Sequence, residues 1–183
     1  ELFDHETVIE MDVIKLLVYD FDGVMTDNKL YIDQDGHEMV QVSRADGLGV
    51  SEIRKLGIEQ IILSTEENPV VAARARKLGL NCLQGIKDKA LALAEYCAEH
   101  QTSLEAVAYV GNDINDLEAM RMVGMTFCPA DAHQDIKQFS SHVLKTPGGG
   151  GVLRELVGIL INKTTNKRTL IISLRKRRTA RRT

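Results

Sequence analysis

The sequence has no apolar run long enough to cross a bilayer, and its first residues lack the basic-then-apolar pattern of a secretion signal. Cysteine is scarce: Cys82, Cys97 and Cys128 are odd in number and lie far apart in apolar surroundings. The five histidines are scattered as well, so the ligand spacing typical of a zinc site is missing. These absences predict buried free thiols in a reducing compartment, with the cytoplasm as the expected location and no membrane partner.

Acidic residues are missing from the chain after Ile161, although the net charge of the whole sequence is −3. The stretch instead carries nine basic residues: Lys163, Lys167, Arg168, Arg175, Lys176, Arg177, Arg178, Arg181 and Arg182. Such a run can bind nucleic acid or an anionic surface, or it can be a solvated extension. Because no aromatic residue is interleaved for stacking on bases, we favour a flexible basic tail over 162–183 and expect no nucleic-acid partner.

The overall composition is that of one globular domain, with 44% hydrophobic and 27% charged residues. The chain begins with Glu1 rather than Met, and its first twelve residues are acidic. We therefore expect residues 1–12 to be a linker, residues 13–161 to be the folded domain, and the chain to be a segment of a longer protein.

Strand and helix signals alternate along the predicted domain. Apolar runs predict strands at Ile14–Asp20, Gln60–Leu63, Ala106–Val110 and Met125–Cys128. Helical spacing predicts helices at Asp46–Leu56, Asn68–Leu78, Lys87–His100, Leu117–Val123, Ala132–Phe139 and Val152–Ile161. Between the first strand and the first helix, Lys29–Ile32 and Glu38–Val42 flank Asp33-Gln34-Asp35-Gly36, which is typical of a hairpin. The pattern predicts an α/β fold with a doubly wound, mostly parallel, Rossmann-like sheet and a β-hairpin insertion.

The most informative run is Leu16–Asp27, in which a buried-strand pattern ends in Asp20-Phe21-Asp22-Gly23. Open α/β sheets place their ligands outside the carboxyl ends of the strands, where these two carboxylates fall. Two anionic groups so close repel each other unless a cation or a proton relieves them. The pattern suits a metal-assisted nucleophile beside a general acid. The alternative is a turn in which Asp and Gly serve only the backbone.

Three further positions carry polar groups next to predicted elements. Ser64-Thr65 follows a strand and suits a phosphate oxygen. Lys87 and Lys89 stand at the start of a helix, where the dipole disfavours cations, so an anionic partner would explain them. Gly111-Asn112-Asp113-Ile114-Asn115-Asp116 follows a strand and is rich in the hard oxygen ligands that Mg²⁺ prefers. Each has a purely structural explanation, but four such motifs in order favour an active site.

This ordered set resembles the haloacid dehalogenase superfamily of phosphotransferases over nearly all of residues 14–161. The resemblance implies that Asp20 is the nucleophile, that Asp22 is the general acid and base, and that Lys89 neutralises charge on Asp20. It further implies that Ser64 holds the phosphoryl group. Mg²⁺ would be bound by Asp20, by the backbone carbonyl of Asp22, and by the motif at Asn112-Asp113.

One residue departs from the family pattern, which usually has Asp where this chain has Asn112. Either Asn112 binds the metal through its amide oxygen, or Asp113 supplies the charge directly or through water. We expect weaker metal affinity with activity retained.

The inserted hairpin is too short for the cap domain that many superfamily members carry. The chain therefore resembles the capless branch of 3-deoxy-manno-octulosonate (KDO) 8-phosphate phosphatases and nonulosonate (sialic acid, KDN) 9-phosphate phosphatases, and the module fused to CMP-sialic acid synthetases. Arg44-Ala45-Asp46-Gly47-Leu48-Gly49 and Gly148-Gly149-Gly150-Gly151-Val152-Leu153-Arg154-Glu155 carry this resemblance. It implies a homotetramer built through the hairpins, with Arg154 or the glycine loop entering a neighbour's pocket, and a fusion to a cytidylyltransferase domain.

Substrate choice depends on finer features. Glu66 and Lys77 match a pair associated with the nine-carbon phosphatases, whereas the eight-carbon enzymes tend to have Gly-Arg after the motif's hydroxyl residue. Glu66 would bind sugar hydroxyls, while Lys77 or Arg44 would pair with the substrate carboxylate. Thr65 would contact the phosphate beside Ser64, and Arg154 would reach the substrate from a neighbouring chain. We expect a Mg²⁺-dependent phosphatase for a nine-carbon sugar acid phosphate. The alternatives are KDO 8-phosphate as substrate and a non-catalytic tetramerisation domain.

Overall fold

The computed structural model describes residues 14–161, so the predicted linker and basic tail lie outside the described residues. Six strands form a parallel sheet in the order β5-β4-β1-β6-β7-β8. In chain order they are β1 (Leu16–Tyr19), β4 (Glu59–Leu63), β5 (Asn81–Leu83), β6 (Val107–Val110), β7 (Met125–Cys128) and β8 (His142–Val143). All four residues of β1 are buried because the strand lies inside the sheet with both faces covered.

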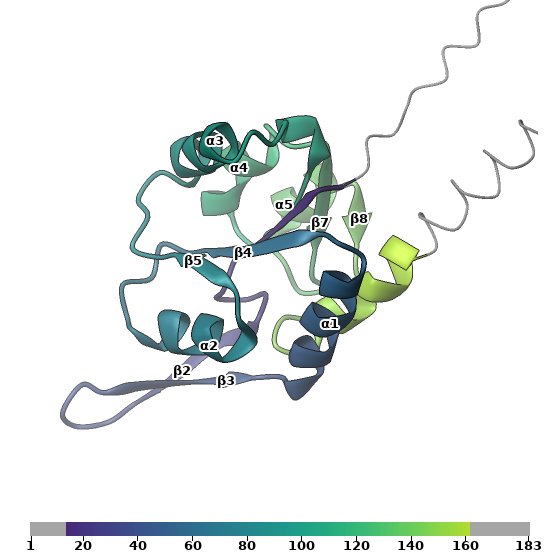
Figure 1. Ribbon diagram of the computed structural model, residues 1–183. Coiled ribbons are helices and arrows are strands. Elements are labelled where there is room, and N and C mark those ends of the chain that lie inside the picture. Colours follow the sequence, from purple (N-terminus) through teal and green to yellow (C-terminus); the bar gives the residue numbers. More distant parts are fainter. Residues whose placement is uncertain (1–13, 162–183) are drawn as a thin grey trace, which may run out of the picture.

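Helices cover both faces of this sheet (Figure 1). On one face lie α1 (Arg44–Lys55), α2 (Val70–Leu78) and the helical residues 152–161; on the other lie α3 (Lys89–Glu99), α4 (Leu117–Met120) and α5 (Gln134–Phe139). Leu17 of β1 belongs to the first core and Val18 to the second, as the alternation of side chains along a strand requires. The doubly wound α/β prediction is confirmed. None of the described helices is long and apolar enough to span a membrane.

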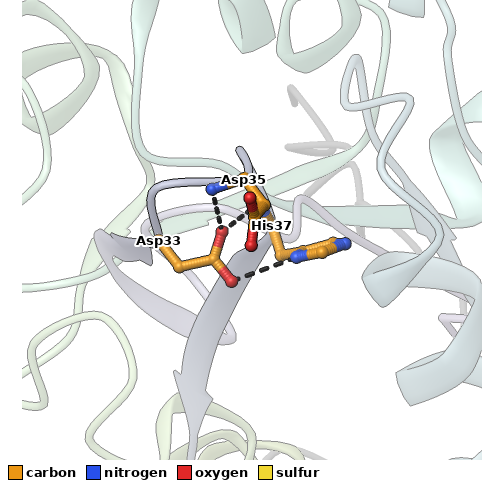
Figure 2. Close-up of side chains that lie close together, drawn as sticks. All are labelled: Asp33, Asp35 and His37. Atoms are coloured by element: carbon orange, nitrogen blue, oxygen red, sulfur yellow. Dashed lines mark hydrogen bonds and ion pairs between the residues drawn. The ribbon is translucent and has the colours of Figure 1, made fainter.

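A two-stranded antiparallel hairpin, β2 (Thr26–Ile32) and β3 (Glu38–Val42), leads from β1 to α1 and projects from the body (Figure 1). No cap domain intervenes between these elements, as predicted. Four apolar side chains of the hairpin are exposed: Leu30, Tyr31, Ile32 and Met39. At the tip, Asp33 accepts hydrogen bonds from the backbone N–H groups of Asp35 and His37 and lies 3.0 Å from the His37 ring (Figure 2). These exposed groups close the turn.

Candidate active site

Asp20 is the first residue beyond β1 and is almost completely buried. Its backbone N–H donates to Val110, which continues the sheet bonding and fixes the backbone. Its Oδ1 accepts from the Phe21 N–H at 2.7 Å and lies 2.8 Å from Lys89 Nζ. Burial and the nearby Asp116 raise the pKa of Asp20 to about 8, against the opposing effect of Lys89. An Asp20 carboxylate is therefore stable at neutral pH only with further positive charge nearby.

Lys89 lies at the start of α3, capped by the Asp88 side chain, and its ammonium is buried between two carboxylates. Its Nζ donates to Asp116 Oδ1 at 2.7 Å as well as contacting Asp20. Burial acts to lower the pKa of Lys89, but Asp20 and Asp116 outweigh it and the pKa is raised. The cation at this helix start thus has the anionic partner that its position required.

Asp116 ends the short 3₁₀ helix η2 (Ile114–Asp116) and is fully buried. Its Oδ1 also accepts from the Tyr109 hydroxyl at 2.9 Å, and its Oδ2 accepts from the Asn112 and Asp113 N–H groups. Four donors therefore hold this carboxylate between Lys89 and the loop after β6. Sequence analysis included Asp116 in the oxygen-rich run but gave it no role.

Asp22 lies in the turn after Asp20 and is half-buried. The Thr26 hydroxyl lies 3.4 Å from Asp22 Oδ1 and accepts from the Gly23 N–H. Burial, followed by the charge of Glu66, raises the pKa of Asp22. A carboxyl with a raised pKa holds a proton more readily, which a general acid needs.

Asn112 lies over the same turn, and its side-chain amide faces two oxygen acceptors there. Its amide oxygen is 2.8 Å from the Asp22 carbonyl oxygen and 3.0 Å from Asp20 Oδ2. Without a cation, the amide would be better rotated so that its nitrogen donates to both oxygens. Octahedral Mg²⁺ with ligands at about 2.0–2.1 Å separates neighbouring ligand oxygens by about 2.9 Å. Both distances from the Asn112 oxygen are close to that spacing.

Asp113 lines the same pocket as Asp20, and its side chain caps the helix η2. It is exposed, and its Oδ1 accepts from the Ile114 N–H at the start of η2.

Gly23 has φ +79°, and a Cβ there would lie 2.0 Å from the Asn112 amide nitrogen. A side chain at position 23 would therefore displace Asn112.

A pocket of about 360 Å³ opens above these groups. It is lined by Asp20, Asp22, Asn28, Thr65, Asn112, Asp113 and Asn115. Ser64 is fully buried beside it, and its Oγ accepts from the Glu66 N–H. Asn28 was not predicted from the sequence, and Asn115 belonged to the predicted oxygen-rich run without a role of its own.

Of the five predicted substrate-binding residues only Thr65 lines this pocket, whereas Arg44, Glu66, Lys77 and Arg154 do not. Arg44 is the exposed first residue of α1, and Lys77 is exposed in the last turn of α2. Arg154 is exposed, and it adds a small effect to that of Lys55, which is the main cause of the lowered pKa of Glu52. Within the described residues, no lysine or arginine lines the pocket itself.

The glycine loop packs against the nucleophile turn of its own chain. A Cβ on Gly148 would lie 2.2 Å from the Gly23 carbonyl oxygen, and one on Gly149 would lie 2.6 Å from the Asp27 nitrogen. The Gly149 N–H donates to the Val24 carbonyl, and the Gly148 N–H donates to Asp131. The loop therefore supports the turn that carries Asp22.

Comparisons with known proteins agree with this geometry. A family model of haloacid dehalogenase-like hydrolases matches residues 83–156. The 3-deoxy-D-manno-octulosonate 8-phosphate phosphatase KdsC of Haemophilus influenzae is 31% identical over 153 residues, which are 83% of this chain and 85% of that protein. A Streptomyces avermitilis structure, described only as a HAD family hydrolase, is 48% identical with a TM-score of 0.77, covering 80% of this chain and 84% of that one.

The crystal structure of 3-deoxy-D-manno-octulosonate 8-phosphate phosphatase from Moraxella catarrhalis contains magnesium, phosphate and KDO. It is 28% identical, with a TM-score of 0.79 over 88% of this chain and 93% of that one. The resemblance predicted from the sequence is therefore confirmed: the chain belongs to the haloacid dehalogenase-like hydrolases, within the capless KdsC family of sugar acid phosphate phosphatases.

Proposed function

We propose that this protein is a Mg²⁺-dependent phosphatase that cleaves the phosphate ester of a 3-deoxy-2-keto sugar acid through an aspartyl-phosphate on Asp20. One observation carries the proposal: a buried carboxylate at the end of the central strand is paired with Lys89 and adjoins two further ligand oxygens. A stability role does not require this arrangement, because a buried carboxylate with a pKa of about 8 is costly to keep ionised.

The residues have separate roles in this reaction. Asp20 forms the bond to phosphorus, held in orientation by the Phe21 N–H and the Lys89 ammonium. Asp22 donates its proton to the leaving ester oxygen and then takes one from the attacking water, which the raised pKa favours. Asp20, the Asp22 carbonyl and Asn112 would hold Mg²⁺. When bound, the ion offsets the charge repulsion between the carboxylate and the phosphate oxygens.

For the substrate we propose KDO 8-phosphate. The Haemophilus influenzae relative carries the name of a KDO 8-phosphate phosphatase, and the Moraxella catarrhalis structure is a complex with magnesium, phosphate and KDO. These comparisons favour the eight-carbon acid over the nine-carbon acid that the sequence features suggested. A nine-carbon acid phosphate is the second candidate, because Glu66 lies close enough to Asp22 to raise its pKa and could accept hydrogen bonds from hydroxyls of a longer chain.

We also propose that the exposed hairpin is the assembly surface of a homotetramer. Leu30, Tyr31, Ile32 and Met39 form an apolar group on a two-stranded arm with unpaired edges. The pocket, which has no lysine or arginine among its lining residues, would then acquire its carboxylate-binding charge from groups outside it, such as Arg44 or a neighbouring chain.

The test is phosphate release from KDO 8-phosphate, KDN 9-phosphate and N-acetylneuraminate 9-phosphate, with Mg²⁺ and with chelator. We expect turnover that needs Mg²⁺ and that Asp20→Asn abolishes. If the wild type and Asp20→Asn release phosphate equally slowly from all three substrates, the enzyme proposal is wrong and a non-catalytic assembly domain remains. Faster turnover of a nine-carbon substrate would keep the reaction and change the assigned acid.

A further inference from the structure

Asn28 has an unusual backbone conformation next to the active site. Its φ is +61°, and among the described residues only one other non-glycine residue, Gln101, has a positive φ. L side chains rarely adopt this conformation, and such residues gather at ligand-binding sites where the surrounding structure fixes them. The Asn28 N–H donates to the Thr26 hydroxyl, the same group that accepts from Gly23 and contacts Asp22. The nucleophile turn itself therefore holds the backbone of Asn28.

Asn28 is an exposed residue and one of those that line the pocket above Asp20. The residues that line this pocket beyond the metal ligands offer amides, a hydroxyl and a carboxylate: Asn28, Asn115, Thr65 and Asp113. An amide donates and accepts hydrogen bonds at once, as a hydroxyl does, so these groups are complementary to a hydroxylated carbon chain. The carboxylates of Asp22 and Asp113 would repel the carboxylate of a sugar acid. The pocket is thus suited to the carbons next to the phosphate ester rather than to the acid end.

We propose that Asn28 is a specificity-determining residue whose side-chain amide hydrogen-bonds the hydroxyls on the carbons next to the phosphate ester. This inference rests on the proposed function, and it adds which part of the substrate the pocket recognises. The competing explanation is that Asn28 is needed only for its backbone, because asparagine tolerates the left-handed conformation where the chain enters the hairpin.

Asn28→Gly separates the two explanations, because glycine adopts φ +61° freely and removes only the amide. With full-length protein and Mg²⁺, we expect KM for KDO 8-phosphate to rise about five- to tenfold, the size of one lost hydrogen bond, with kcat changed less than about twofold. The ratio of kcat/KM for KDO 8-phosphate to that for p-nitrophenyl phosphate, which has no sugar hydroxyls, should fall by a similar factor. Asn28→Asp keeps the backbone preference and adds a negative charge, so its KM should rise further.

Gln101→Gly is the matched control, because it relieves the other left-handed residue at a site after α3 and outside the pocket lining. It should leave both kinetic constants at wild-type values. In thermal unfolding neither glycine variant should melt below the wild type. The proposal is overturned if Asn28→Gly has the wild-type KM, or if it loses activity equally on both substrates.

Failure of the proposed function gives a different result. If the wild type cleaves p-nitrophenyl phosphate but no sugar acid phosphate, the substrate proposal is wrong while the pocket remains testable with sorbitol 6-phosphate. A fall of about fivefold or more in the sorbitol 6-phosphate to p-nitrophenyl phosphate ratio on Asn28→Gly would then support recognition of hydroxyls. An unchanged ratio would refute it.

Discussion

Replacing Asn112 by aspartate tests the metal site directly. The new carboxylate would occupy the place of the amide, with one oxygen about where the amide oxygen lies 3.0 Å from Asp20 Oδ2. Two full charges at that separation repel by about 5 kcal/mol at an effective dielectric constant of about 20. Protonation of one carboxyl relieves part of this repulsion in the metal-free protein. Mg²⁺ binding relieves the remaining repulsion. We therefore expect the free energy of Mg²⁺ binding to become more favourable by about 1.5–3 kcal/mol, which lowers the Kd by about 10- to 100-fold.

The assay is calorimetric titration with MgCl₂, accompanied by thermal unfolding with and without the metal. Metal-free Asn112→Asp should melt below the wild type, and Mg²⁺ should raise its melting temperature by a larger step. Asp113→Asn is the control: its side chain caps η2 and is exposed, so its Mg²⁺ affinity should stay within about twofold of the wild type. Unchanged affinity in Asn112→Asp would refute position 112 as a ligand. A large loss in Asp113→Asn would assign the ligand to Asp113.

Three further predictions follow from buried charge and exposed apolar surface. Asp116→Asn should lower the free energy of unfolding in urea by about 3–5 kcal/mol, because one of the two carboxylates flanking the buried Lys89 ammonium is lost; a loss under about 1 kcal/mol would contradict the network. Burial raises the pKa of Asp46 from 3.8 to about 6, so its protonation stabilises the fold below about pH 4 and this contribution is lost as pH rises through 6. The unfolding free energy of the wild type relative to Asp46→Asn should therefore fall by about 3 kcal/mol between about pH 4 and 7, and a constant difference would show that Asp46 is not perturbed. Tyr31→Lys on the hairpin should lower the mass measured by light scattering, whereas Leu91→Lys, at an exposed apolar residue on α3, should not; an unchanged mass in Tyr31→Lys would reject the hairpin as the assembly surface.

The sequence predicted the sheet and the central motif because both depend on local patterns. A buried strand that ends in Asp20 and Asp22 is visible in the order of residues alone. The position of Lys89 also indicated a site, because a cation at the start of a helix is unfavourable unless an anion lies nearby. In the structure Asp20 and Asp116 are these anions. The two edge strands β5 and β8 were missed because each has only two or three residues and includes a polar one, Asn81 or His142.

Other features of the site depend on distance in space rather than order in sequence. Nothing local to Asp116 indicates that its Oδ1 meets a lysine 27 positions earlier in the chain. The φ of Asn28 is likewise invisible in the sequence, although a run of Thr, Asp and Asn after the nucleophile favours a turn. The roles given to Arg44, Lys77 and Arg154 came from the family resemblance and from charge complementarity, neither of which gives the direction of a side chain. The structure places all three residues outside the pocket lining. Their roles stay predictions.

The helix over residues 152–161 has a consequence for how the protein folds while the ribosome synthesises it. Its residues Val152, Leu153, Leu156, Val157 and Leu160 fill the core between α1 and the sheet, and the Leu153 N–H donates to the buried Asp46. A ribosome delivers these residues after every strand of the sheet, so this half of the core stays open to water until they emerge. Because the glycine loop precedes this helix and packs against the turn at Gly23, the active site should become competent only after residues 152–161 have been made and have packed.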